Sequence, residues 1–156
     1  METVFIKTPL GIAKIVGDEK GVSVISVSDE GASSSIIPII LQEAVLQLND
    51  YFEGKRIDFT FKLNPSGTEF QQKVWKGLLG IPFGKTISYL ELSKKLGDVK
   101  AIRAVASANG KNPLWIVVPC HRVIGTDGSL TGYAGGLWRK KWLLEHEKPT
   151  NQVSLF

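Results

Sequence analysis

The chain has 156 residues, 43% of them hydrophobic, with one cysteine, two histidines and a formal net charge of +4. That length suits one domain or two small ones, a single cysteine excludes an internal disulfide, and so few soft ligands argue against a structural metal. Because no apolar run reaches the roughly 20 residues of a membrane span and the first residues do not resemble a signal peptide, we expect a cytoplasmic protein with no membrane contact.

The first third of the chain predicts a strand-rich scaffold with a covering helix. Residues 3–28 alternate apolar and polar side chains in short bursts between glycine-containing turns, which predicts an antiparallel meander. A helix is predicted over 36–52 and one more strand over 57–61. We expect these elements to form an αβ scaffold domain over residues 1–63, with no catalytic group. The expected inward face of the helix is Ile40, Ala44, Leu48 and Phe52.

The second part of the chain, residues 67–148, predicts a winged helix-turn-helix domain after a linker at 64–67. Its first helix should run to about Leu79 and bury Phe70, and two shorter helices follow, joined by a glycine-containing turn. Each of the three begins at a capping signal. The expected signals are Ser66 with Glu69, Ser88 with Glu91, and Asp98 for the third helix, roughly 99–109.

The third helix has two different faces. Its expected inward stripe includes Val105 and Asn109, whereas the other face pairs cations with very small side chains. Since lysine and arginine gather in this half of the chain, that face could lie against an anionic partner such as nucleic acid; close packing of another helix would explain it equally well. The residues of the outer face are Lys100, Arg103, Ala104, Ser107 and Lys111.

The end of the domain predicts a wing, a loop and a closing helix. An Asp-Gly pair within residues 123–130 favours a β-hairpin, which after a helix-turn-helix is a wing. A flexible loop follows at 133–136, and the closing helix is expected over 137–146. Residues 149–156 are expected to form a flexible tail.

The only cysteine follows a proline and precedes a histidine, which favours nucleophilic chemistry. An isolated thiol is mostly protonated at neutral pH, so Cys120 needs a base, and the base needs an orienting group. His121 is the nearest base, and because neighbouring side chains point apart, contact through a water is favoured. Glu145 and Glu147 are both candidates to orient His121, and spacing does not decide between them.

Several strings together carry a resemblance to a known family. Over residues 67–147 they resemble the O6-alkylguanine-DNA alkyltransferases, and the N-terminal part is compatible with the ribonuclease H-like domain of that family. The strings are Gly67-Thr68-Glu69-Phe70-Gln71, Ile81-Pro82-Phe83-Gly84-Lys85-Thr86, Arg103-Ala104-Val105, Pro119-Cys120-His121-Arg122-Val123 and Tyr133-Ala134-Gly135-Gly136-Leu137.

This resemblance implies a DNA repair protein without a cofactor or metal. It would bind double-stranded DNA as a monomer, extrude an O6-alkylguanine and move the alkyl group irreversibly onto Cys120, so that each molecule acts once. O4-alkylthymine is an expected second substrate. In this family the helix-turn-helix enters the minor groove, and the small residues Ala104 and Ser107 suit that close approach.

The resemblance also implies a role for each matching residue. Cys120 would be the acceptor, His121 its base through a water, Glu147 the group that orients His121, and Asn112 a brace for the turn. Tyr89 would protonate or hydrogen-bond the departing guanine, and Arg103 would fill the space that the flipped base leaves. Backbone N–H groups of the loop would bind O6. The remaining substrate and DNA contacts are Trp115, Val123, Tyr133, Ala134 and Gly135.

Two further expectations concern specificity and partners. Trp115 is bulky for its position, and we expect it to restrict large adducts. The tail residues Gln152, Leu155 and Phe156 resemble the pentapeptide by which bacterial repair proteins dock on the sliding clamp, although they could also fold back on the body.

Other classes fit the residues less well. Alkyltransferase-like proteins that only recognise the lesion lack the acceptor cysteine, which is present here. A winged-helix transcription regulator would not need the Pro-Cys-His-Arg-Val string. A thiol hydrolase would need a substrate pocket for which no other signal exists. The enzyme interpretation is therefore preferred.

Overall fold

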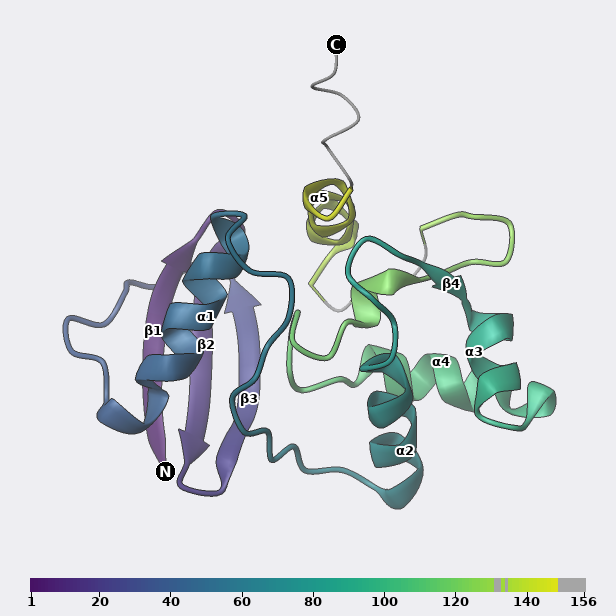
Figure 1. The fold of residues 1–156 in the computed structure, drawn as a ribbon, viewed down its shortest axis with the longest axis horizontal. Helices are drawn as coiled ribbons and strands as arrows, with labels where there is room; N and C mark the ends of the chain where they lie inside the picture. The colour runs from purple at the N-terminus through teal and green to yellow at the C-terminus, as the bar shows by residue number, and fades with distance from the viewer. Residues whose placement is uncertain (131–132, 134, 149–156) are drawn as a thin grey trace, which may run out of the picture.

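A computed structural model describes residues 1–130, 133 and 135–148 and has a mixed α/β architecture (Figure 1). A three-stranded sheet covered by one helix forms the N-terminal half, and a group of helices forms the C-terminal half. The predicted division into a strand-rich and a helical part is confirmed. None of the described helices is long and apolar enough to cross a membrane.

The sheet is the predicted antiparallel meander. Its strands are β1 (Glu2–Thr8), β2 (Gly11–Asp18) and β3 (Gly21–Ser28), in that order. Alternate residues point to opposite faces of a strand, so Val4 and Ile15, which pair across β1 and β2, are both fully buried.

The covering helix begins later than predicted. A short 3-10 turn, η1 (Ile39–Leu41), leads into α1 (Gln42–Phe52). Pro38 explains the difference, because the residue before a proline is disfavoured in the helical region. The predicted inward face was right for Ala44 and Leu48 but wrong for Ile40, which is exposed; Leu41 and Tyr51 are buried instead.

The strand predicted over 57–61 does not form. Its two phenylalanines, Phe59 and Phe61, pack against the core, while Ile57 is exposed. The segment pairs with the sheet only after this stretch, where Leu63 forms a bridge to Val22 of β3. A second segment meets the same strand: Ile25 donates to the Pro113 carbonyl at 2.8 Å, and Trp115 donates to the Ile25 carbonyl at 3.0 Å. Two segments that run parallel to β3 thus cover its open edge, and the second of them comes from the C-terminal half and joins the two halves.

The first C-terminal helix, α2 (Glu69–Leu78), begins at a different capping box from the predicted one. Thr68 is its N-cap and exchanges hydrogen bonds with Gln71, so the predicted Ser66–Glu69 pair is wrong. The observed box lies two residues later in the chain than the predicted one. Phe70 is exposed, whereas Trp75 is buried and donates from its indole nitrogen to the Ala108 carbonyl at 2.8 Å.

The next two helices form the predicted helix-turn-helix. Ser88 and Glu91 make the predicted capping box of α3 (Tyr89–Lys95). Asp98 then caps the short turn η2 (Val99–Ala101), which continues into α4 (Ile102–Gly110). Local capping chemistry was sufficient to place both helices.

The predicted wing hairpin is only partly formed. A tight turn closes where Gly125 donates to the Ser129 carbonyl at 2.8 Å. However, β5 (Val123–Ile124) pairs in parallel with β4 (Ile87–Ser88), and no return strand appears among the described residues. The strand β5 therefore pairs with a segment 36 residues earlier in the chain, because the residues before α3 lie alongside it.

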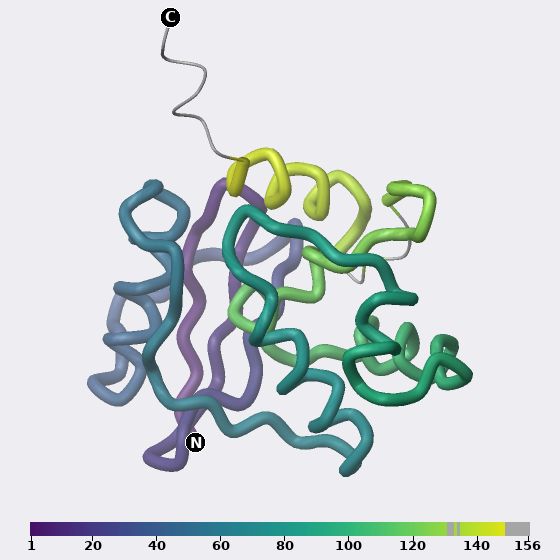
Figure 2. Tube along the Cα trace, turned by 45° about the vertical axis from the view of Figure 1, so that its right-hand side comes forward, coloured from purple at the N-terminus to yellow at the C-terminus, as the bar shows by residue number. Residues whose placement is uncertain are grey.

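The closing helix α5 (Leu137–His146) is confirmed. Figure 2 shows it running across the top of the molecule, with its C-terminal end beside the strands of the N-terminal half. This path brings the residue after the helix, Glu147, into contact with both halves of the protein.

Candidate functional site

Cys120 lies in a buried turn that the backbone holds firmly. It begins the 3-10 turn η3 (Cys120–Arg122) and is 7% exposed. The Asn112 side-chain amide lies across the segment before it and donates to the Val118 carbonyl at 2.7 Å. Asn112 Oδ1 also accepts from the Leu114 backbone N–H at 2.9 Å. The cysteine is therefore presented by a turn that one asparagine crosslinks.

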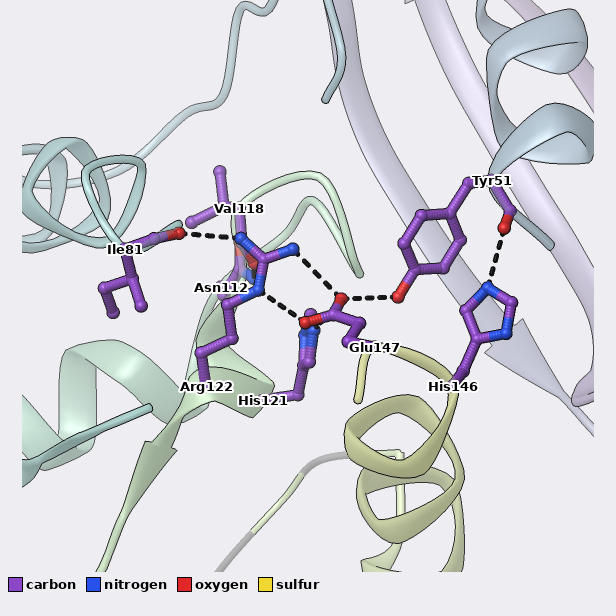
Figure 3. Close-up of polar contacts among 8 residues, drawn as sticks. All are labelled: Tyr51, Ile81, Asn112, Val118, His121, Arg122, His146 and Glu147. Atoms are coloured by element: carbon purple, nitrogen blue, oxygen red, sulfur yellow. Dashed lines mark hydrogen bonds and ion pairs between the residues drawn. The ribbon is translucent and has the colours of Figure 1, made fainter. Parts of the chain in front are cut away.

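The carboxylate of Glu147 is the centre of the polar network beneath this turn (Figure 3). Its Oε2 lies 2.8 Å from His121 Nε2 and accepts from Tyr51 at 2.6 Å and from Arg122 at 3.0 Å. Its Oε1 accepts from Arg122 Nε at 2.8 Å. Arg122 also donates to the Ile81 carbonyl at 2.7 Å. The structure decides between the two candidate carboxylates, because Glu145 is exposed and pairs with Lys148.

The charge of this network is set by burial and pairing. Burial raises the pKa of Glu147, but hydrogen bonds from His121 and Arg122 and their charges outweigh it, so that the pKa lies well below its usual range. The carboxylate is therefore ionised. Burial lowers the pKa of His121 more than Glu147 raises it, so the imidazole is neutral at pH 7.

The neutral imidazole has one free acceptor. Because the carboxylate is an acceptor only, His121 Nε2 carries the proton and donates to it. His121 Nδ1 then has a lone pair, and among the described residues this buried atom has no hydrogen-bond partner. The ring is thus held by one nitrogen and is able to take a proton on the other.

The thiol of Cys120 is protonated at rest. Burial raises its pKa, and the nearby Asn112 amide and the Lys140 ammonium oppose this shift. Lys140 is completely buried and donates to the Val123 carbonyl at 2.8 Å, beside the strand that follows the cysteine. A fixed cation at this place favours the thiolate once a base removes the proton.

A small cavity of about 130 Å³ opens next to Cys120. Tyr89 lies close to it: its hydroxyl accepts a 3.5 Å hydrogen bond from the Asn109 amide, which also reaches the Cys120 carbonyl at 3.5 Å. Both halves of the protein line the cavity, because β3 contributes three of its residues. The lining residues are Ile25, Ser26, Val27, Asn109, Gly110, Asn112, Trp115, Cys120, Tyr133 and Gly135.

The outer face of α4 is exposed, as predicted. Arg103, Ala104 and Ser107 are accessible, while Val105 and Asn109 on the other face are buried. Because Asn109 lines the cavity, one helix presents a basic, small-residue surface outward and contributes to the cysteine pocket inward.

The structure adds residues that sequence reasoning missed and leaves others undescribed. Nothing in the sequence around Tyr51 or Lys140 indicates a place at the site, and Asn109 was expected only to face inward. Arg122 is a charged residue beside apolar ones, and this pattern could have indicated a buried ion pair. Val123 is buried beneath the site. The predicted site residues Ala134, Gln152, Leu155 and Phe156 lie outside the described residues. Within the described part of the chain, no group of side chains could hold a metal ion.

The buried Trp115 limits the size of this cavity, which leads to a prediction. For the alkyl transfer that the family resemblance implies, we expect Trp115→Ala to raise the ratio of benzyl to methyl transfer by roughly tenfold or more, since the lost indole leaves room for a larger group. The ratio is obtained by incubating the protein with duplexes that carry each O6 adduct. Trp115→Leu, which opens the cavity less and disturbs packing less, should give an intermediate ratio. An unchanged ratio in both variants would contradict the prediction.

Comparison with known proteins finds a matching family model for each half of the chain. A family model described as the 6-O-methylguanine DNA methyltransferase DNA-binding domain matches residues 69–149, and one described as its ribonuclease-like domain matches residues 2–65. The methylated-DNA–protein-cysteine methyltransferase of Methanosarcina barkeri is 44% identical over 150 residues, covering 92% of this chain and 94% of that protein. That of Methanosarcina mazei is 46% identical over 151 residues, with coverage of 92% and 94%.

Solved structures agree with these matches. Mycobacterium tuberculosis O6-methylguanine methyltransferase superposes with a TM-score of 0.83 at 42% identity, covering 96% of this chain and 95% of that one. Mycobacterium tuberculosis OGT in complex with DNA superposes with a TM-score of 0.84 at 44% identity, covering 92% and 91%.

Proposed function

Because the chain belongs to the 6-O-methylguanine DNA methyltransferase family, we infer that it repairs DNA by moving an alkyl group from O6 of guanine to its own Cys120. The observations that carry this inference are the buried Cys120 and the neutral His121 that follows it, whose buried Nδ1 has no hydrogen-bond partner among the described residues.

The reaction forms one bond to sulfur and breaks one to oxygen. His121 Nδ1 takes the thiol proton through a water, and the thiolate attacks the alkyl carbon. The carbon–O6 bond breaks, and the guanine leaves after receiving a proton, for which Tyr89 is the proposed donor. The thioether is stable, so each molecule is consumed in one turnover. The Lys140 ammonium stabilises the Cys120 thiolate, and the Glu147 carboxylate stabilises the His121 imidazolium.

We propose that the alkylated base leaves the duplex before it reacts. Guanine O6 lies inside the double helix, and a cysteine that is 7% exposed at the edge of a small cavity cannot reach it there. The exposed face of α4, with Arg103, Ala104 and Ser107, is the proposed minor-groove contact, and Arg103 would occupy the space of the extruded base. O4-alkylthymine is a proposed second substrate, since it presents an alkyl group on an equivalent oxygen.

Intact mass spectrometry tests the proposed function. After incubation with a duplex containing O6-methylguanine, the wild-type chain should gain one methyl group in place of a hydrogen, mapped to Cys120 and saturating at one per molecule. Cys120→Ala should bind the duplex without any gain. Binding by the wild-type chain with no mass change would overturn the proposal and place the protein among damage-recognition proteins.

We also propose that the chain acts as a monomer and docks on the bacterial sliding clamp through its tail. The tail string Gln152-Val153-Ser154-Leu155-Phe156 places two large apolar side chains at the end of the sequence, as clamp ligands do. Deleting residues 152–156 should abolish retention on immobilised clamp and leave methyl transfer to free duplex unchanged. Equal retention of both forms would remove the clamp proposal.

A further inference from the structure

One side chain of the N-terminal half reaches the site. Tyr51 lies in the last turn of α1 and is completely buried. Its hydroxyl donates to Glu147 Oε2 at 2.6 Å, and the same oxygen lies 2.8 Å from His121 Nε2. Figure 3 shows the phenol approaching the carboxylate from the side away from Arg122. Tyr51 and His121 therefore share one acceptor.

The phenol is held at this place by contacts on both sides. The Tyr51 carbonyl lies 2.7 Å from His146 Nε2, a bond that ties α1 to the end of α5. The ring packs against Phe59 and Phe83, with centroids 5.6 and 6.3 Å away. A side chain fixed in this way keeps its hydroxyl on the carboxylate rather than rotating away.

The phenol is also a permanent donor. Burial raises the pKa of Tyr51, and the neighbouring Glu147 charge raises it further, so the hydroxyl stays protonated wherever the protein is folded. The other charged groups that act on His121 are Arg122 and Lys140, and Tyr133 is coupled to both Cys120 and Glu147. Of these groups, Tyr51 is contributed by the scaffold half.

A donor on a carboxylate weakens the hold of that carboxylate on its other partners. Each hydrogen bond that Glu147 Oε2 accepts disperses its negative charge and lowers the stabilisation it offers to a protonated imidazole. His121 has to be neutral at rest to accept the thiol proton. Without the Tyr51 hydrogen bond, the Glu147 carboxylate would stabilise the protonated form of His121 more strongly and keep it protonated to higher pH.

We propose that Tyr51 is a positioning residue that keeps His121 in its neutral, proton-accepting form by drawing charge from the Glu147 oxygen that holds the imidazole. The inference rests on the proposed function, in which His121 accepts the proton of Cys120. It gives the N-terminal half a chemical role in the reaction, through a bond between residues 96 positions apart.

The test is Tyr51→Phe, which removes the hydroxyl and keeps the ring. The side-chain nitrogen signals of the chain's two histidines, followed by NMR from pH 8 downwards until His121 is protonated, report the protonation midpoint of His121 directly. We expect that midpoint to rise by about half a pH unit in the variant. The acid limb of the single-turnover methyl-transfer rate should move to higher pH by the same amount.

Phe61→Leu is the matched control, because it perturbs the same cluster of rings through Phe59 and keeps the residues that pack on the Tyr51 ring. It should leave both the midpoint and the acid limb in place. A Tyr51→Phe midpoint that coincides with the wild-type value, or a rate that falls equally at every pH, would overturn the proposal. A wild-type chain that transfers no methyl group at any pH would overturn the proposed function instead, and the NMR midpoint would still report on Tyr51.

Discussion

Replacing Glu147 with alanine is expected to destabilise the folded protein by about 3–5 kcal/mol, because the buried Arg122 guanidinium loses its counter-charge. The carboxylate also accepts from His121 and Tyr51, so three buried side chains lose a partner at once. Denaturant unfolding monitored by tryptophan fluorescence measures the loss. Methyl transfer should fall as well, since the imidazole is no longer oriented.

The same helix end offers the control for this variant. Glu145 lies two residues earlier, is exposed and pairs with Lys148 on the surface, so Glu145→Ala should change the stability by less than about 1 kcal/mol. Glu147→Gln separates orientation from charge, because it keeps the shape and one acceptor but removes the ion pair. Similar unfolding free energies for the alanine variants at 145 and 147 would contradict the burial argument.

Replacing His121 with asparagine is expected to slow methyl transfer by about 100- to 10,000-fold near neutral pH, the range that a general base supplies. Single-turnover rates on an O6-methylguanine duplex measure this. Without the base, transfer depends on spontaneous ionisation of Cys120. Since burial raises the pKa of that thiol, the variant's rate should keep increasing with pH above the ordinary thiol value of about 8.5.

The wild-type rate should depend on pH in a different region. Because the pKa of His121 is lowered by burial, the imidazole stays neutral down to below its ordinary value of about 6.5, and the rate should fall only in more acidic solution. Glu145→Ala, which changes only the exposed pair with Lys148 at the end of α5, should keep this wild-type profile. A His121→Asn variant with the wild-type rate and profile would show that another group takes the proton.

Much of the fold followed from patterns that span only a few residues. The alternation in 3–28 predicted the meander, and the Ser88–Glu91 box and the Asp98 cap predicted the helix-turn-helix, since these signals act between neighbours in the chain. Where two local signals competed, the prediction failed: the first C-terminal helix took the Thr68–Gln71 box rather than Ser66–Glu69. The expected buried face was also wrong at Phe70, which is exposed, whereas Trp75 is buried.

The strands between distant segments were not predictable in this way. The alternation at 57–61 and the Asp-Gly turn in 123–130 both favour local strands, but the chain paired Leu63 with β3 and β5 with β4 instead. Such pairings depend on which backbone edges the packing of the helices brings together. No periodicity within either segment contains that information.

The sequence by itself determined the reacting group: one cysteine, a histidine beside it and a set of strings that resemble a known family. Only the tertiary structure decided how that group is controlled. It brought Glu147, which the resemblance had implied, rather than Glu145 onto His121. It also supplied Arg122 and Lys140 and placed Tyr51 on the Glu147 carboxylate. The reason is physical, because a nucleophile is identified by its own chemistry, whereas its protonation is set by burial and by partners that meet only when α1, η3 and α5 pack together.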